Sequence, residues 1–320
     1  LDLGEYQSVD CIRARDGLVY AAAYDGAALK KRRSDLVRTD GGHTAAVLTV
    51  DGELTGFAFD GSGDLWLSIL TPGGGSLCRA AHDSWGTAVE QVVTQIDGAP
   101  LGAVSAVEAA PDGRIYFAVA AAAGAADGLE STLRTELLAH TGTDCVYVYD
   151  PAARSVQKVL GGVAGAAGLA LSPDGSTLYV SDLASRCVWR VSADAQDLTA
   201  GGKNCSSFVS GLPGYPGALA MDPDGTLYIG YRWARSSWLE KNAGSTLLRG
   251  IALRAGRNLQ EKLFSLPADA PCTEAVDTAD GSWQRVVSSR GAGSVTALCP
   301  VESRLYLGLA GSETVRSANL

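Results

Sequence analysis

Residues 217–228, GALAMDPDGTLY, contain the phrase that determines the fold: a few apolar residues, a turn rich in Asp and Gly, and an aliphatic residue followed by an aromatic one. In this copy Pro223 fixes φ and Gly225 can adopt a positive φ, so the chain reverses tightly between two strands. Five further copies end in an aromatic residue at the same place: VDCIRARDGLVY (9–20), TGFAFDGSGDLW (55–66), SAVEAAPDGRIY (105–116), GLALSPDGSTLY (168–179) and VTALCPVESRLY (295–306).

The spacing of the six copies predicts a β-propeller. Successive aromatic residues lie 46, 50, 63, 49 and 78 residues apart. A repeat of roughly 45–50 residues with one strand–turn–strand signal per unit is typical of propeller blades. Because each blade covers its apolar faces only by stacking on its neighbours, we predict one all-β domain over residues 1–320. It is a six-bladed β-propeller with four-stranded antiparallel blades.

Two long gaps in the repeat indicate insertions. After the second strand of the third blade, DGLESTLRTELLAH (127–140) places Leu129, Leu133 and Leu137 on one helical face. We predict a short helix that caps one mouth of the propeller; a partner-binding helix is the alternative. The second insertion begins YRWARSSWLEK (231–241), and we expect it to follow the second strand of the fifth blade at a mouth of the channel. It is either a ligand-binding rim or a covering loop.

Charge and cysteine content limit the possible partners. The formal net charge is −9 without a long basic face, which argues against nucleic acid and anionic membranes as partners. No apolar stretch reaches membrane-spanning length. The seven cysteines include no C-x-x-C pair, so we expect mostly buried thiols, with at most one disulfide, which would not join Cys187 to Cys205. Because the chain starts at Leu1 without Met, we expect a preceding segment, such as a signal peptide or an N-terminal anchor, to be missing.

Residues 116–191 resemble the strictosidine synthase family, which has the same helix-bearing insertion, a YDP turn (149–151) and the phrase ALSPDGSTLYVSD (170–182). GYPGALAMDPDGTLYIGYRWARSS (214–237) and VVSSRGAGSVTALCPVESRLYLGLAGS (286–312) are similar to the strictosidine-synthase-like branch that includes adipocyte plasma membrane-associated protein. The resemblance covers residues 100–320 well and the first two blades loosely. It implies a six-bladed propeller in the wider group of calcium-dependent phosphotriesterases and gluconolactonases, and a secretory, lumenal or membrane-anchored location.

The repeat also locates a candidate site. In a propeller the innermost strands start at one mouth of the central channel, where side chains from all blades converge. Counting about eleven residues back from each aromatic residue gives a ring and its next neighbours: Val9, Thr55, Ser105, Ala167, Gly217 and Val295, then Asp10, Gly56, Ala106, Gly168, Ala218 and Thr296. Calcium needs about six to eight oxygen ligands, and Asp10 is the ring's single carboxylate. We therefore predict no bound metal and no cofactor.

The family comparison leads to the same prediction. Related metal-binding propellers carry Glu, Asn and Asp at the positions of Val9, Ala167 and Gly217 or Ala218. Strictosidine synthases place a catalytic Glu on the sixth inner strand, where this chain has Thr296, which cannot shuttle a proton near neutral pH.

Asp10 remains as the candidate acid or base, with a pKa raised by the channel's low dielectric; the alternative role is a hydrogen-bond acceptor that closes a blade. The candidate ligand-binding residues are Thr55, Ser105, Tyr231, Arg232, Trp233 and Arg235.

Three functions are consistent with these residues. We predict a small-molecule-binding or pseudoenzyme propeller, because the ring lacks the acids and amides of its catalytic relatives. The first alternative is an ester or lactone hydrolase of the paraoxonase or gluconolactonase type. The second is an amine–aldehyde condensing enzyme of the strictosidine synthase type, in the carbon–nitrogen lyase class.

Overall fold

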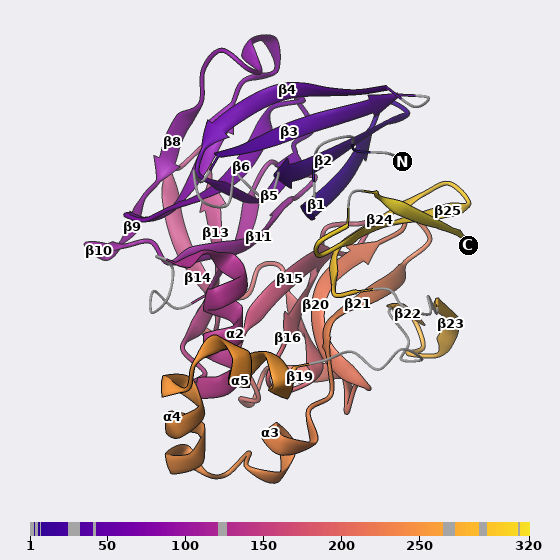
Figure 1. The fold of residues 1–320 in the computed structure, drawn as a ribbon. Helices are drawn as coiled ribbons and strands as arrows, with labels where there is room; N and C mark the ends of the chain where they lie inside the picture. The colour runs from indigo at the N-terminus through magenta and orange to yellow at the C-terminus, as the bar shows by residue number, and fades with distance from the viewer. Residues whose placement is uncertain are drawn as a thin grey trace.

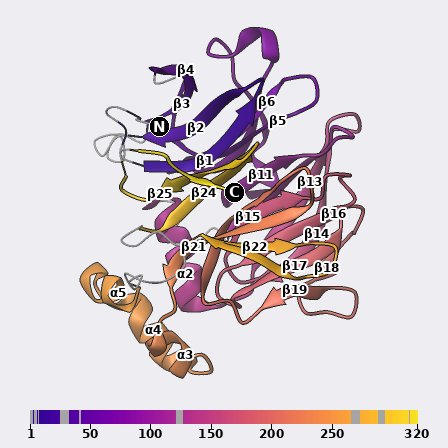
Figure 2. The same ribbon diagram turned by 90° about the vertical axis from the view of Figure 1, so that its right-hand side faces the viewer.

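The computed structural model describes residues 3, 6, 8–24, 33–40, 43–120, 127–264, 273–287, 293–312 and 314–320. Six antiparallel sheets stand around a common axis, one for each copy of the repeated phrase (Figures 1 and 2). The predicted six-bladed β-propeller is therefore confirmed.

The strands of the six blades run in sequence order. They are β1 (Ser8–Arg15), β2 (Leu18–Tyr24), β3 (Arg33–Asp40) and β4 (His43–Asp51) in the first blade; β5 (Glu53–Phe59), β6 (Leu65–Thr71), β7 (Gly74–Ala80) and β8 (Glu90–Val93) in the second; β11 (Ala103–Ala109), β12 (Ile115–Ala120), β13 (Asp144–Asp150) and β14 (Ser155–Val163) in the third; β15 (Ala166–Leu171), β16 (Thr177–Asp182), β17 (Cys187–Ser192) and β19 (Ser206–Ser210) in the fourth; β20 (Gly214–Met221), β21 (Thr226–Ala234), β22 (Thr273–Asp277) and β23 (Trp283–Val287) in the fifth; and β24 (Val295–Val301), β25 (Arg304–Leu309) and β26 (Arg316–Asn319) in the sixth.

The remaining elements lie between or beside the blades. They are η1 (His82–Ser84), β9 (Gln95–Ile96), β10 (Ala99–Pro100), β18 (Leu198–Thr199), α2 (Leu129–Ala139), α3 (Ser237–Lys241), α4 (Thr246–Arg254) and α5 (Arg257–Leu263). The third blade gains β18, which runs parallel to β14. The sixth blade has three strands within the described residues, where the sequence predicted four.

The repeated phrase forms a tight hairpin for a local reason. In the fifth blade the Asp222 carboxylate accepts hydrogen bonds from the backbone N–H of Asp224 at 3.0 Å and of Thr226 at 2.8 Å. Gly225 closes the turn with φ 88°, which costs glycine little. Tyr228, the aromatic residue that ends the phrase, donates its hydroxyl to Asp222 at 3.2 Å. Each hairpin therefore fixes where its innermost strand ends and where its second strand begins.

The core is divided among the seams between blades. Six apolar clusters each join two neighbouring blades, including the sixth and the first. The aromatic residue of the phrase is buried in the first five blades; those residues are Tyr20, Trp66, Tyr116, Tyr179 and Tyr228. This arrangement is the reason why the repeat must close into a ring: an unpaired blade would leave one of its faces exposed.

The predicted helix after the third blade's second strand is confirmed as α2. Leu129, Leu133 and Leu137 point into a seventh cluster, where they meet Trp233 and Phe264. The second insertion differs from its prediction in two ways. Residues 231–234 do not follow the strand but extend it, because β21 continues pairing with β20 as far as Ala234. The residues after it form the three helices α3, α4 and α5, which gather beside α2 (Figure 1).

Cysteines behave as expected where the structure describes them. Six are free thiols, and Cys272 lies outside the described residues. Cys187 pairs with Ser210 in the ladder between β17 and β19, so Cys205, which precedes β19, is at the opposite end of the blade. The prediction that Cys187 and Cys205 form no disulfide is confirmed.

Candidate functional site

The ring predicted from the repeat coincides with a structural irregularity shared by all six blades. Each innermost strand changes register near its start, once in five blades and twice in the fifth. A bulged residue is left out of the ladder and re-aims its side chain. The residues skipped are Asp10, Thr55, Ser105, Ala167 with Gly168, Gly217 with Ala218, and Thr296.

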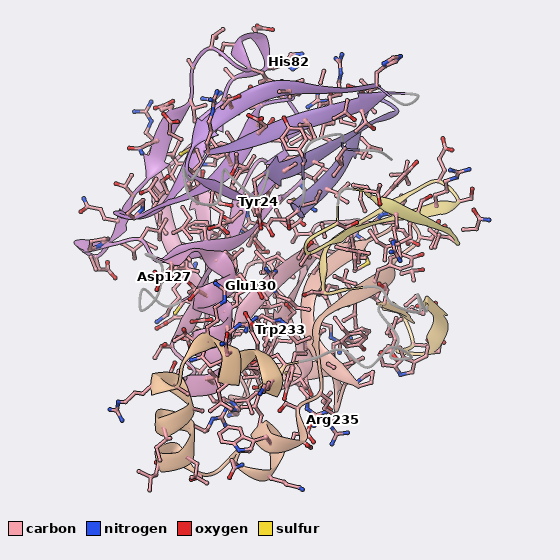
Figure 3. All side chains as sticks on the ribbon, viewed as in Figure 1. Tyr24, His82, Asp127, Glu130, Trp233 and Arg235 are labelled. Carbon is pink, nitrogen blue, oxygen red and sulfur yellow. The ribbon has the colours of Figure 1, made fainter. Side chains whose placement is uncertain are left out.

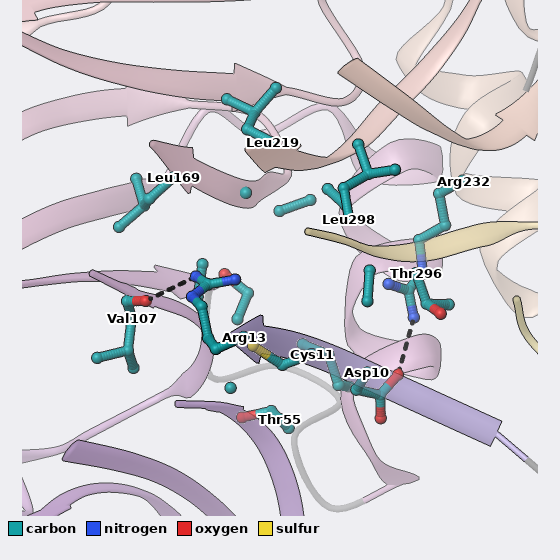
Figure 4. A pocket seen from close by; sticks show the side chains of 18 residues that line it. Asp10, Cys11, Arg13, Thr55, Val107, Leu169, Leu219, Arg232, Thr296 and Leu298 are labelled. Carbon is teal, nitrogen blue, oxygen red and sulfur yellow. Dashed lines mark hydrogen bonds and ion pairs between the residues drawn. The ribbon is translucent and has the colours of Figure 1, made fainter. Parts of the chain in front are cut away.

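These bulges surround a cavity on the channel axis (Figure 4). Its volume is about 30 Å³, which is enough for a water molecule. Nine of the twelve predicted ring positions line it, with at least one from every blade, so the structure brings the predicted ring together. Leu129 of α2 and Arg232 of β21 complete the wall.

Three hydroxyls of the ring are engaged in holding blades together. Thr55 donates to the Val104 carbonyl of the third blade, and Ser105 to the Ala166 carbonyl of the fourth, both at 2.5 Å. Thr296 donates to the Val9 carbonyl and so joins the sixth blade to the first. Ligand binding by Thr55 and Ser105 stays a prediction, and a ligand would have to compete with these bonds.

Asp10 is the carboxylate of the ring, and it is almost completely enclosed. Its side chain is 3% exposed, and its Oδ1 lies 4.0 Å from Nη2 of Arg232 (Figure 4). Its Oδ2 is buried without a hydrogen-bond partner among the residues that the structure describes. Burial raises the pKa of Asp10 to about 7; the charge of Glu53 raises it further, and the Arg232 guanidinium opposes the rise. The charge of Asp10 in turn raises the pKa of Tyr24.

Arg232 connects the ring to the helical cap. It extends from β21, and its Nε and Nη2 lie 2.9 and 2.8 Å from Oε2 of Glu130 in the first turn of α2. Although burial opposes it, the Arg232 guanidinium lowers the pKa of Glu130. Arg134, one helical turn later, also reaches Glu130 at 3.3 Å. Arg232 therefore lies between two carboxylates, one on the ring and one on the cap.

A second carboxylate fixes the start of the cap. The backbone N–H of Leu129 donates to both oxygens of Glu53, at 3.2 and 3.1 Å. Glu53 belongs to β5, so the second blade supplies a negative charge at the end of the helix where the free N–H groups point. The predicted capping role of α2 follows from these contacts, and Figure 3 shows Glu130 beside the centre of the propeller.

Of the four residues of the predicted ligand rim, only Arg232 and Trp233 are neighbours, with the Arg232 guanidinium carbon 5.9 Å from the centre of the Trp233 ring. Tyr231 donates to Glu274, and Trp233 packs against Phe264 with 5.5 Å between ring centres. Arg235 is exposed and pairs with Glu240, away from Glu130 in Figure 3. Successive side chains of a strand point to opposite faces, so Arg232 alone of the four reaches the cavity.

The sequence analysis missed Glu53, Glu130 and Tyr24. The position of Glu130 could have been predicted from the sequence, because Glu130 follows Leu129 at the start of the predicted helix, which was expected to cap the channel mouth. Glu53 lies two residues before the ring position Thr55, which also placed it near the mouth. Tyr24 ends β2 and had no signal of its own.

The residues on the axis do not fit a calcium ion. Calcium prefers about six to eight oxygen ligands with several carboxylates. The axis instead offers one carboxylate, Asp10, with hydroxyls that already donate to backbone carbonyls, and the positive charge of Arg232 lies 4.0 Å from that carboxylate. The part of the chain that the structure describes contains no group of three or more His, Cys, Asp or Glu side chains placed to hold a metal.

A protein-family match covers the central part of the chain. Residues 87–238 match the family described as SMP-30/Gluconolactonase/LRE-like region, which covers slightly less than half of the chain, from the second blade to the fifth. The match supports the wider group that the sequence resemblance implied, the gluconolactonase-like propellers. The narrower assignment to the strictosidine-synthase-like branch stays a proposal. No curated protein matches the chain significantly.

Solved structures of several functions share the fold. A gluconolactonase from Xanthomonas campestris has a TM-score of 0.66 at 16% identity, covering 99% of this chain and 87% of that one. A chain of the nidogen/laminin complex has a TM-score of 0.61 at 13% identity, with coverage of 95% and 89%. Regucalcin, a calcium-binding protein from Agrobacterium tumefaciens, has a TM-score of 0.58 at 14% identity, with coverage of 96% and 84%. At these identities the likeness concerns the fold alone.

Proposed function

We propose that this propeller hydrolyses a small ester or lactone at the axis of its channel, with Asp10 as the general base. The observation that carries the proposal is the Asp10 carboxyl, which has a pKa of about 7 and a buried oxygen without a hydrogen-bond partner among the described residues. A general base works best when its pKa is near the working pH. The gluconolactonase-like match of residues 87–238 supports this reaction over binding alone.

The reaction needs a nucleophile and a group that stabilises negative charge. The cavity beside Asp10 has room for one water molecule, so α2, whose Leu129 closes the wall, would have to move aside for a substrate carbonyl to reach that water. Ionised Asp10 would take a proton from that water as its oxygen attacks the carbonyl carbon. The guanidinium of Arg232, 4.0 Å from Asp10, would stabilise the oxyanion that forms. The carbon–oxygen bond to the leaving group would then break, and Asp10 would return its proton to the alkoxide.

The test is a hydrolysis assay that follows acid release from five- and six-membered lactones and from aryl esters. We expect turnover that survives a chelator and rises with pH through a midpoint near the Asp10 pKa of about 7. Asp10→Asn should lose about 100-fold or more in rate. The matched control is Glu136→Gln, which changes another buried carboxyl with a raised pKa that lines neither the axial cavity nor the larger pocket. Absence of turnover, or turnover that chelation abolishes and Asp10→Asn does not change, would refute the proposal.

Binding without turnover is the second candidate function, and a different cavity favours it. At the other end of the inner strands a pocket of about 330 Å³ is lined by the Arg13–Glu108 ion pair, Met221, Cys299 and three prolines. This volume is within the usual range for small ligands, roughly 300–1,000 Å³, whereas the cavity at Asp10 is far below it. Titration calorimetry with lactones and their product acids tests this candidate: binding that Ala170→Trp blocks and Asp10→Asn does not would support it.

Amine–aldehyde condensation is not proposed. That reaction would need an acid–base group on the sixth inner strand, where Thr296 is engaged with the Val9 carbonyl. Incubation with tryptamine and a monoterpene aldehyde is the corresponding test, and we expect no product.

A further inference from the structure

The exposed apolar side chains of this protein are concentrated on one small feature. Among the described residues five large hydrophobic side chains are exposed, and four of them lie on α4 and α5. They are Leu247 at 74%, Leu248 at 42%, Ile251 at 56% and Leu259 at 54%; the fifth, Trp283, lies on β23 at 48%. Scattered exposed hydrophobics need no explanation, but a group of them on one surface indicates an interaction site.

The fold holds this surface outward. Leu247, Ile251 and Arg254 follow an i, i+4, i+7 spacing and so share one face of α4. The opposite face carries Arg249 and Ala252, both buried. Arg249 donates to the carbonyls of Leu137 and Leu138 at the end of α2, both at 2.8 Å. The helix therefore cannot turn its exposed face inward without breaking these bonds. Figure 2 shows α3, α4 and α5 at the outer limit of the molecule.

The charge around the exposed face is opposite to that of the chain. Residues 237–263 contain five Lys or Arg and two Glu, whereas the whole chain has a formal net charge of −9. Arg254, Arg257 and Lys262 are exposed on α4 and α5. Arg257 pairs with Glu261 at 2.9 Å, and both partners remain in contact with solvent.

We propose that α4 and α5 dock this protein onto an anionic lipid surface. A helix with large apolar residues flanked by cations lies in the membrane interface, with the apolar face at the acyl boundary and the cations among the headgroups. Each Lys or Arg near an anionic bilayer adds to the attraction. Docking of two copies through the same face would instead bring their cations together, which opposes a symmetric dimer. The net charge of −9 for the whole chain argued against an anionic membrane as a partner. That total does not reveal that residues 237–263 are locally positive.

The proposed contact is peripheral. The described helices include none that is both long and apolar enough to cross a membrane, and α4 has nine residues. The surface lies on the same side as α2, because α4 packs on α2. Docking would therefore turn the capped mouth of the channel toward the lipid.

Co-sedimentation of the full chain with vesicles tests the proposal. We expect binding to vesicles of phosphatidylcholine mixed with phosphatidylserine, weak binding to phosphatidylcholine alone, and release at high salt. The double variant Leu247→Ser, Ile251→Ser should weaken binding roughly tenfold. Arg254→Gln, which removes one positive charge, should weaken it roughly fivefold. Trp283→Ser is the matched control, because this exposed aromatic residue lies on β23 and not on the helices, and it should bind as the unchanged protein does.

Two outcomes would overturn the proposal. One is equal binding to anionic vesicles by the protein and the Leu247→Ser, Ile251→Ser variant, or no binding by either. The other is a dimer in sedimentation equilibrium that this variant abolishes while vesicle binding is absent, which would assign the surface to a second copy. The substituted side chains are exposed, so circular dichroism should be unchanged, and the assay does not depend on hydrolysis.

Discussion

Replacement of Asp10 by Asn should make the protein more stable at neutral and higher pH. In the folded protein the Asp10 carboxyl has a pKa of about 7, against an ordinary value of 3.8. The stability that comes from holding this proton is fully present below the unfolded value and is lost as the pH rises through the folded value. The difference between the two values corresponds to a loss of about 4 kcal/mol in the free energy of unfolding.

Asn is close to Asp in size and does not titrate, so the variant should escape this loss. We expect the two proteins to diverge from about pH 4 upward and the difference to become constant above about pH 7. Urea unfolding at a series of pH values measures it. Asp174→Asn is the contrasting control: hydrogen bonds from Ser172 and Ser176 lower the pKa of Asp174 to about 2, so its effect should change only in acid. A constant difference for Asp10→Asn between about pH 4 and pH 8 would refute the description of a desolvated carboxyl.

Two further substitutions test the surroundings of this group. Glu130→Gln removes a negative charge that raises the pKa of Asp10, so the pH-dependent loss of stability should shift to lower pH in the same urea series; an unchanged midpoint would contradict the coupling. Thr296→Val removes the hydroxyl that donates to the buried Val9 carbonyl, and the free energy of unfolding should fall by about 1–3 kcal/mol. Thr87→Val, which loses an exposed hydroxyl bond, should change it by less than about 0.5 kcal/mol, and similar losses for both variants would argue against a role in ring closure.

The fold and the ring were predictable because the sequence repeats them. Each phrase fixes a hairpin, and the distance from the hairpin to the bulge is nearly constant, so counting back from Tyr20 or Trp66 finds Asp10 or Thr55 without any knowledge of the fold in space. The helix α2 was predictable because Leu129, Leu133 and Leu137 follow a helical period. In both cases the sequence pattern is local, and the structure has the hairpin or helix that the pattern predicts.

The charged contacts above the ring were not predictable in the same way. Arg232 meets Glu130 across 102 residues, and this meeting depends on how far β21 continues and where the insertion places α2. The sequence pattern around Tyr231 and Trp233 resembles a ligand rim, but Tyr231 bonds Glu274 and Trp233 packs on Phe264, so neither lines the cavity. Helices α3 and α4 did carry a signal in the sequence, since Ser236 and Ser245 are N-caps that accept from the backbone N–H three residues later.

Helix α2 does more than cap the mouth of the channel, because its contacts also link two blades. Glu53 holds its first residue from the second blade, and Arg232 holds its first turn from the fifth. In a ring of six, those two blades stand opposite each other. The insertion therefore connects opposite sides of the ring through the first turn of α2. A shift of the second blade can be transmitted to the fifth blade through this turn, without passing through the blades between them.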